Sequence, residues 1–351
     1  MVTWRGREHL PACLDALAAQ ERPHRTLVVD NGSADGTARV LAEHPSRPDV
    51  LRLPRNLGYA GGIAAALAQV RTPFTAWLND DAAPEPGWLA ALEDALDADP
   101  GAWAASSLLR GPGGRVQSLG VRLTADGHGA DLGGLDSPDF RSADRDGADH
   151  DGADREDADH DGADPADPDL ADPDVGGPHL DVPELDRIPP GGAVFEVFGF
   201  CGGAALTRTA RVRAVGGVPA GFFCYYEDTD TSWRLRLAGG RVLAVPAARA
   251  IHRHGASSEP GSARFHRWNE RNRLLALLRC APGPVAAGQL ARFAALTLAL
   301  IWRRGQQPPN FRVALRLRVL AEVCAALPAA LRARRRFHPA RRAAVWQHWA
   351  G

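Results

Sequence analysis

The chain has 351 residues, 45% of them hydrophobic, which is enough for one large domain or two small ones. Its five cysteines are scattered and odd in number, which argues against a disulfide framework or a cysteine-rich zinc site and favours a reducing compartment. The formal net charge of −1 hides an asymmetry, because residues 125–190 hold 21 acidic side chains and 4 arginines and leave the remainder strongly basic.

Strands and helices are predicted to alternate through the first hundred residues. Buried-strand patterns occur at 26–30, 50–53, 74–78 and 102–106. Helical patterns occur at 10–17, around 40–41, at 61–70 and at 86–96. This order indicates a mostly parallel sheet covered by helices, with ligands at the carboxyl ends of the strands. Asp30 and the pair Asp80–Asp81 each follow a strand, so we expect these two acidic turns to share one rim.

Residues 125–190 form an imperfect acidic repeat with few large apolar side chains. Such a segment cannot bury enough surface to offset the loss of chain entropy, so the composition predicts a disordered insert. Order is expected to return at 194–206, followed by a helix from about Thr207 and a strand at 241–245. From 262 onward the chain is predicted to be helical, and from Arg303 it carries eleven arginines and one glutamate.

Two segments near the start, VVDNGSADGT (28–37) and NLGYAGG (56–62), have ordinary and functional explanations. The first contains common turn formers and is equally well explained as an Asx turn after a strand. The second reads as a helix entry, although glycines at a helix N-terminus also suit a diphosphate.

The segment WLNDDAAPEPGW (77–88) places Asp80 and Asp81 directly after an apolar strand. Adjacent carboxylates repel each other and lose hydration there, which a plain surface loop does not explain. One or two carboxylates on a rigid turn can hold a divalent ion that keeps other positions free for a substrate phosphate. His252 and His254 follow a later strand; a lone histidine is usually structural, but neutral imidazole also binds such ions.

The segment YYEDTDTSWRLRLAGG (225–240) puts carboxylates at a helix start, where the helix dipole favours anions. In the structural interpretation, Asp228 or Thr229 caps a helix whose Trp233 and Leu237 face the core. In the functional interpretation, a carboxylate beside aromatic rings acts as a general base.

Taken together and in this order, these motifs resemble the family 2 glycosyltransferases of the GT-A fold, closest to their bacterial rhamnosyltransferase-like and galactofuranosyltransferase-like branch. The likeness covers roughly residues 2–124 and 192–280 and also includes IHRHGAS and RNRLL. It implies an α/β, Rossmann-like mixed and mostly parallel sheet. The expected parts are a nucleotide-sugar-binding half at 1–124, the insert at 125–190, an acceptor and catalytic half at 191–280, and a basic amphipathic helical tail at 281–351.

The resemblance also implies roles for single residues. Asp81, the last acid of the family's DXD-type turn, would bind Mg²⁺ or Mn²⁺ together with His252, whose spacing to Ser257 favours it over His254. Asp228 would be the catalytic base, beside Glu227. Donor contacts are expected from Thr3, Asp30 (to the nucleobase), Asn56, Gly58, Asp80 (near the ribose) and Arg271. Acceptor contacts are expected from Gly202, Gly203 and Trp233.

Four features depart from the family pattern. Asn79 stands at the first acid of the metal-binding turn, a common variant in this branch. The first strand is reduced to MVT, where relatives extend upstream, so we expect either that the true start lies further upstream or that the edge of the nucleotide pocket is weak. Ile63–Ala64 replaces an asparagine often found there, which puts one ribose or phosphate contact in doubt. The acidic insert is peculiar to this chain.

We therefore predict a metal-dependent inverting glycosyltransferase of cell-envelope polysaccharide synthesis. It would move a sugar from a nucleotide-diphosphate donor to a hydroxyl of a glycan or polyprenyl-linked acceptor. One alternative is a sugar nucleotidyltransferase, which would need a glycine-rich, basic phosphate loop near the N-terminus. The other is a catalytically impaired family member that serves as a membrane-associated scaffold.

The location is predicted to be cytoplasmic, at the inner face of the cell membrane. The N-terminus lacks the apolar core of a signal peptide, and the stretch 285–302 makes a poor membrane span because it carries Gln289 and Arg292. Apolar stretches alternate with arginine clusters through 284–349, a pattern that suits helices lying on an anionic membrane surface. The alternative is a helical subdomain packed on the catalytic core with a solvated basic face. No nucleic-acid partner is expected.

Overall fold

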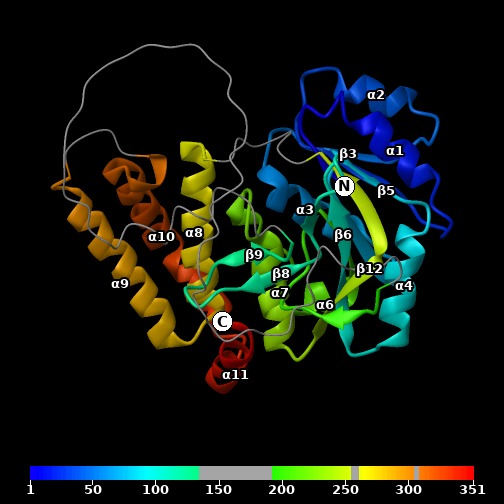
Figure 1. Cartoon of the computed structure of the whole chain (residues 1–351). Helices are drawn as coiled ribbons and strands as arrows, with labels where there is room; N and C mark the ends of the chain where they lie inside the picture. Colours follow the sequence, from blue (N-terminus) through cyan, green and yellow to red (C-terminus); the bar gives the residue numbers. More distant parts are fainter. Residues whose placement is uncertain (134–191, 254–260, 304–307) are drawn as a thin grey trace, which may run out of the picture.

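The computed structural model describes residues 1–133, 192–253, 261–303 and 308–351. An α/β part holds the N-terminus, and a group of long helices from the C-terminal third lies beside it (Figure 1). The mixed α/β class with a helical C-terminal region, predicted from the sequence, is confirmed.

The first sheet is fully parallel and has the order β1-β2-β3. Its strands are β1 (Val2–Thr3), β2 (Leu27–Asp30) and β3 (Asp49–Arg52). The helices that follow them are α1 (Leu10–Ala18), α2 (Thr37–Glu43) and α3 (Gly58–Gln69). Although β1 is only two residues long, it pairs in register with β2, and a bridge from Val2 to Asn79 links this sheet to the next one.

The second sheet is mixed, with the order β10-β12-β6-β11-β4; β5 also pairs with β12, and β7 with β6. Its strands are β4 (Phe74–Leu78), β5 (Ala82–Pro84), β6 (Ala102–Arg110), β7 (Val116–Ser118), β10 (Phe195–Glu196), β11 (Ala204–Arg208) and β12 (Arg241–His252). Of its strand pairs, β6–β12 is parallel and the others are antiparallel. The prediction of a mostly parallel sheet is therefore wrong. Strand β11, which follows the insert in the sequence, enters antiparallel between β4 and β6, and local periodicity cannot reveal such a return.

The cores lie on the two sides of this sheet. Helix α4 (Trp88–Ala98) buries Trp88, Leu89, Leu92 and Leu96, residues at helical spacing that form one face. Trp77 of β4 is 1% exposed on the other side and meets Phe200 edge-on, with ring centroids 5.0 Å apart. These contacts fix the end of β4, where the acidic turn begins.

Residues 125–133, which the sequence places in the disordered insert, include a short strand. Strand β9 (Gly129–Asp131) pairs antiparallel with β8 (Val121–Leu123), and Ala130 and Leu132 are buried. Single apolar residues among glycines and aspartates gave no sequence signal for this short hairpin. The remainder of the predicted insert, 134–190, falls within 134–191, outside the described residues. The helix expected from Thr207 is α6 (Thr209–Ala214), because Thr207 is a buried residue of β11.

The C-terminal helices are α8 (Ala263–Cys280), α9 (Gly283–Leu300), α10 (Val313–Arg334) and α11 (Pro339–Trp349). Helix α8 packs along α10, and Leu274, Leu275, Phe293, Val319 and Val323 share one core cluster. Arg316, 5% exposed, donates to Thr297 Oγ1 (3.0 Å) and the Phe293 carbonyl (3.1 Å), which locks α10 to α9. The predicted boundary at 281 therefore falls inside a helical unit that begins with α8.

Candidate active site

The two acidic turns meet on one rim, as the sequence predicts. Thr3 lies in register with Asp30, and its Oγ1 donates to Asp80 Oδ2 at 2.6 Å. Asp30 is 1% exposed; its Oδ1 accepts from the Ser33 amide at 2.9 Å, and its Oδ2 lies 3.6 Å from Arg52. Burial raises the pKa of Asp80 to about 6 despite the Thr3 hydrogen bond, and the charge of Asp81 adds to the rise.

The loop that enters α3 closes this rim on one side. Asn31 Nδ2 donates to Asn56 Oδ1 (3.0 Å) and to the Gly58 carbonyl (2.9 Å), while its Oδ1 accepts from the Leu57 amide (2.8 Å). Gly58 has φ +74°, and a Cβ there would lie 2.1 Å from the Phe223 carbonyl oxygen, so only glycine fits. Ile63, which stands in the family's asparagine region, is buried in the core and supplies no polar contact.

Asp81 and His252 come together across β4 and β12. Asp81 Oδ1 lies 3.2 Å from His252 Nε2, and both side chains are less than a tenth exposed. Although burial opposes it, the hydrogen bond and charge of His252 lower the pKa of Asp81 below its usual value. The Asn79 amide nitrogen lies 3.1 Å from the same Nε2. His254 is outside the described residues.

Gln117 on β7 holds the other side of the His252 ring. Its Nε2 donates to the His252 carbonyl at 3.0 Å, which fixes the orientation of the amide group and turns Oε1 toward His252 Nδ1, at 2.9 Å. Because Oε1 can only accept, Nδ1 of His252 carries a proton; loss of the second proton, from Nε2, would replace the hydrogen bond to Asp81 by a lone pair that a cation can bind. This is the arrangement in which histidine and carboxylate bind a cation.

Few protein side chains are available at this site to bind a metal ion. Within the described ranges no three His, Cys, Asp or Glu side chains are grouped closely enough to form a cage. Asp81 and His252 therefore fit an ion that takes its remaining oxygens from a substrate diphosphate and water.

A strained loop precedes the predicted catalytic carboxylates. Phe223, Tyr225 and Tyr226 have φ of +68°, +70° and +66°, a region that non-glycine residues rarely adopt. Asn272 of α8 stabilises this loop, because its Nδ2 donates to the carbonyls of Phe222 (3.0 Å), Cys224 (2.7 Å) and Tyr225 (2.8 Å). Helix α7 (Glu227–Leu237) starts immediately afterwards.

Asp228 does not cap α7, since the helix begins at Glu227 and its N-cap residue, Tyr226, makes no side-chain cap. Asp228 Oδ2 instead accepts from the Gly202 amide at 2.8 Å, and Oδ1 accepts from the Thr229 amide at 2.6 Å. Burial raises the pKa of Asp228. Burial, with the charge of Asp228, raises the pKa of Glu227 to about 8, and Glu227 Oε2 has no hydrogen-bond partner among the described residues. Of the two side chains, Asp228 is the better stabilised as a carboxylate, because its oxygens accept from two backbone amides.

The turn Cys201–Gly203 connects Asp228 to the turn Asn79–Asp81. The Gly202 amide contacts Asp228, and the Gly203 carbonyl accepts from the Asn79 amide at 3.0 Å. Tyr59 of α3 donates to the Gly202 carbonyl at 2.7 Å and fixes the turn from the other side. The predicted acceptor residues Gly202 and Gly203 thus lie between the two chemical centres.

Trp233 cannot contact an acceptor. Its side chain is fully buried and stacks on Trp346 of α11, with ring centroids 5.9 Å apart, while Phe198 meets it edge-on at 5.7 Å. The predicted acceptor role is wrong, and the structural interpretation, with Trp233 and Leu237 in the core, is correct.

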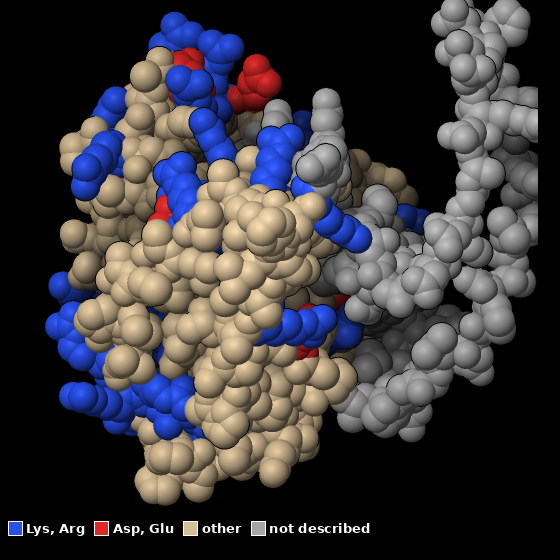
Figure 2. Space-filling model, turned by 90° about the vertical axis from the view of Figure 1, so that its left-hand side faces the viewer, with Lys and Arg blue, Asp and Glu red and all other residues tan. Residues whose placement is uncertain are grey.

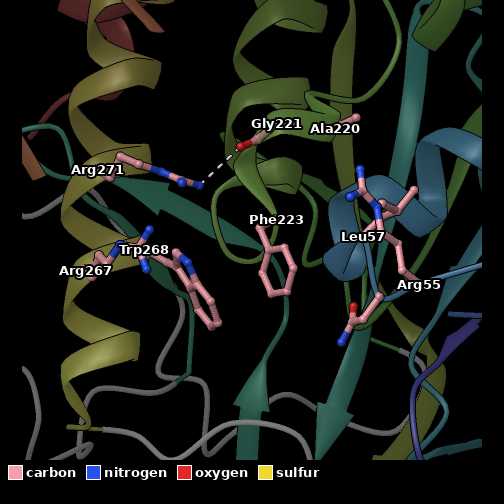
Figure 3. A pocket seen from close by; sticks show the side chains of 9 residues that line it. Arg55, Leu57, Ala220, Gly221, Phe223, Arg267, Trp268 and Arg271 are labelled. Atoms are coloured by element: carbon pink, nitrogen blue, oxygen red, sulfur yellow. Dashed lines mark hydrogen bonds between the residues drawn. The ribbon is translucent and has the colours of Figure 1, made fainter. Parts of the chain in front are cut away.

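Arg271 is separated from the nucleotide rim. It lies on α8 and donates to the Phe222 carbonyl, and its Nη1 is 3.5 Å from Glu322. It lines a pocket between α8 and the entry of α3, on the wall opposite Arg55 and Leu57 (Figure 3). Among the predicted donor-binding residues, Arg271 is the one that the structure does not bring to the rim formed by Thr3, Asp30 and Asp80.

Three residues of this region were missed by sequence reasoning: Gln117, Tyr59 and Asn272. Asn272 belongs to RNRLL, a motif that signalled the family without indicating a role. Tyr59 lies within NLGYAGG but was not singled out. Gln117 lies in a short strand with no recognisable pattern, so nothing in the sequence pointed to it.

Comparison with known proteins gives a family match for the first third of the chain. Residues 1–122 match the family model described as Glycosyl transferase family 2. This match agrees with the motifs found in that part of the sequence.

Individual relatives are similar over different lengths. The N-acetylglucosaminyl-diphospho-decaprenol L-rhamnosyltransferase of Mycobacterium tuberculosis is 27% identical over 278 residues, covering 74% of this chain and 78% of that protein. Rhamnosyltransferase WbbL of Escherichia coli is 34% identical over 84 residues, 24% of this chain and 32% of that protein. Among solved structures, S. aureus TarS 1-349 in complex with UDP-GlcNAc has a TM-score of 0.49 and 16% identity, covering 99% of this chain and 90% of that one.

Proposed function

We propose that this protein is a metal-dependent, inverting glycosyltransferase that uses a nucleotide-diphosphate sugar donor and a lipid-linked glycan acceptor. The observation that carries the proposal is the Cys201–Gly203 turn, which hydrogen-bonds Asp228 through Gly202 and the metal-binding turn through Gly203. A carboxylate base and a cation-binding pair are thereby held at a fixed separation, as an in-line displacement requires.

The donor would lie along the rim formed by Thr3, Asp30 and Asp80, with its diphosphate toward Asp81 and His252. Mg²⁺ or Mn²⁺ held by Asp81 and His252 would neutralise the charge that develops on the leaving diphosphate. Gln117 keeps the imidazole in the tautomer that offers Nε2.

Asp228 accepts the proton of the attacking acceptor hydroxyl, and attack opposite the leaving group inverts the anomeric centre. In this mechanism Asp228 is the ionised member of the pair, because two backbone amides donate to its oxygens, whereas burial raises the pKa of Glu227 to about 8. Burial raises the pKa of the nearby Cys201 thiol well above its ordinary value, which makes this thiol a poor nucleophile and favours direct displacement over a covalent intermediate.

The acceptor class follows from the relative, whose name specifies transfer of L-rhamnose to N-acetylglucosaminyl-diphospho-decaprenol. We propose a polyprenyl-diphosphate-linked glycan as acceptor and a deoxyhexose or related hexose as the transferred sugar. The biological setting would be cell-envelope polysaccharide synthesis.

The membrane contact is proposed on α9 and the chain just after it. Large apolar side chains are exposed there: Leu296, Leu298 (61%), Ile301 and Trp302 (86%). Figure 2 shows the side of the molecule that carries the long helices, where a broad uncharged area has arginines above and below it. This combination suits a surface pressed into the headgroup region of an anionic inner leaflet.

Within the described residues α9 has the length and hydropathy of a membrane span despite Gln289 and Arg292, contrary to the expectation from sequence. Its inner face packs against α8 and α10, so we propose that it lies on the membrane. Helix α11 is excluded from this surface, because Trp346 and Trp349 pack against Trp233 and Phe198.

The experiment is a donor screen by mass spectrometry, with N-acetylglucosaminyl diphosphate on a short prenyl chain as acceptor, with Mn²⁺ and with EDTA. Metal-dependent sugar transfer supports the proposal. Release of diphosphate from a nucleoside triphosphate and a sugar phosphate would instead indicate the nucleotidyltransferase. Donor binding without hydrolysis or transfer would indicate the impaired scaffold.

A further inference from the structure

A pocket of about 470 Å³ opens beside the site, between α8 and the entry of α3. Arg267, Trp268 and Arg271 line it from α8, Arg55 and Asn56 line it from the opposite wall, and Phe223 separates the two walls (Figure 3). The proposed chemistry at Asp81, His252 and Asp228 uses none of the three arginines.

The aromatic residues form a platform. The rings of Phe223 and Trp268 have centroids 4.7 Å apart and an interplanar angle of 32°. Phe223 has φ +68° in the loop that Asn272 holds, so its ring is fixed by the backbone. Two adjacent ring faces in a water-accessible pocket offer apolar area to a sugar ring or a prenyl segment.

The charge of the pocket is positive. Glu322 of α10 accepts from Arg267 Nε (2.9 Å) and from Arg318 Nε (3.1 Å), and it also lies 3.5 Å from Arg271. Three guanidinium groups therefore share one carboxylate. Arg55 is exposed and has no ion-pair or hydrogen-bond partner for its side chain among the described residues. Within the described part of the chain, no carboxylate lines the pocket itself.

We infer that this pocket binds the diphosphate of the lipid-linked acceptor, with Arg55 and Arg271 on the phosphate oxygens and the Phe223–Trp268 platform beside the attached sugar or the first prenyl unit. Guanidinium groups bind phosphate in a bidentate, charge-assisted manner, and a site without carboxylates needs no metal to do so.

This inference rests on the proposed function, and two observations favour the acceptor over the donor as the source of the phosphates. The cation-binding pair Asp81–His252, proposed for the donor diphosphate, lies outside the pocket. The pocket adjoins the helical unit that carries the exposed apolar surface, the side from which a lipid-linked substrate would approach. Only three residues separate Phe223 from Glu227–Asp228, so one loop contributes both to the pocket and to the proposed base.

The test measures two affinities by calorimetry. The acceptor probe is N-acetylglucosaminyl diphosphate on a short prenyl chain, in EDTA, and the donor probe is a nucleoside diphosphate with Mn²⁺. Arg55→Gln is the main variant because, among the residues that the structure describes, the Arg55 side chain has no partner whose loss would disturb the fold. We expect it to weaken acceptor-probe binding about tenfold and nucleoside-diphosphate binding less than twofold. Trp268→Ala should also weaken the acceptor probe. The charge control is Arg39→Gln, on the exposed face of α2, which should change neither affinity.

Equal loss of both affinities in Arg55→Gln would assign the pocket to the donor and overturn the inference. An unchanged acceptor affinity in both Arg55→Gln and Trp268→Ala would overturn it as well. A prenyl N-acetylglucosaminide without the diphosphate should bind wild type at least tenfold more weakly, and equal binding would contradict a phosphate site. Failure of the proposed function is separate, because it appears as absent metal-dependent transfer in wild type whatever these affinities are.

Discussion

Gln117 and His252 are joined by two hydrogen bonds, one from the glutamine amide to the histidine carbonyl at 3.0 Å and one between Oε1 and Nδ1 at 2.9 Å. A glutamine on one strand thus fixes both the backbone and the ring of a histidine on another. The pairing defines which imidazole nitrogen faces Asp81, and it leads to the first prediction.

Gln117→Leu should weaken Mn²⁺-dependent binding of a nucleoside diphosphate about 10–100-fold, because outer hydrogen bonds set the orientation of a ligating imidazole. Calorimetry with and without Mn²⁺ measures this directly. Gln69→Leu, at the exposed end of α3, is the matched control and should behave as wild type. If Gln117→Leu retains full metal-dependent affinity, His252 does not act through Nε2.

Asp228→Asn should reduce sugar transfer by ~10²–10⁴ while nucleoside-diphosphate binding persists, since a general base is worth about that much. The Asn oxygen can still accept from Gly202, so the turn stays in place. Glu227→Gln mimics the protonated acid and should reduce the rate of sugar transfer less than tenfold. Transfer rates near wild type for Asp228→Asn, measured under saturating donor, would remove Asp228 from the role of base.

The stability of the protein should fall with pH because of Glu227. Its folded pKa of about 8 lies above its ordinary value of 4.5, so between these values the unfolded chain releases a proton that the folded chain retains. The destabilisation grows from about pH 4.5 and is complete near pH 8. Glu227→Gln lacks this term, so its melting temperature relative to wild type should increase from pH 5 to pH 8. A constant difference across that range would show that Glu227 ionises normally in the folded protein.

Full-length protein should float with anionic vesicles at low salt and be released at high salt. The double variant Leu298→Ser/Trp302→Ser should float much less, because it removes exposed apolar area without touching the core. Val50→Ser, an exposed residue of β3 on the α/β part, is the control and should float normally. Equal flotation of all three proteins would place the membrane contact elsewhere. Truncation at Arg279 is a poorer test of membrane binding. It would remove α10, which covers Leu274 and Leu275, and would therefore expose core residues of α8.

Much of the nucleotide-binding half could be predicted from local sequence. An apolar run that ends in acids predicted both β2 with Asp30 and β4 with Asp80–Asp81, because a buried strand and its polar end are each a few residues long. The convergence of these turns followed from the geometry of parallel strands, and Thr3 now provides the physical link between them.

The predictions that were wrong or missed have one physical cause. The position of each residue or strand depends on partners that are distant in the sequence. Strand β11 pairs antiparallel because of where the chain returns after the insert, and Trp233 is buried because α11, more than a hundred residues later, supplies Trp346. Neither outcome is encoded in the residues next to the affected position. Gln117 also depends on a distant partner, because it can contact His252 only when β7 and β12 lie close together.

Asn272 holds the loop before α7 through three backbone carbonyls and no side chain of that loop. Because these hydrogen bonds go to backbone carbonyls, the loop can keep its conformation when its side chains are changed. Residues such as Phe223 can be exchanged to suit a different substrate while the backbone continues to deliver Glu227 and Asp228 to the same point. Under the proposed function, this loop is therefore where natural variation or laboratory evolution could change the acceptor without rebuilding the residues proposed to perform the transfer.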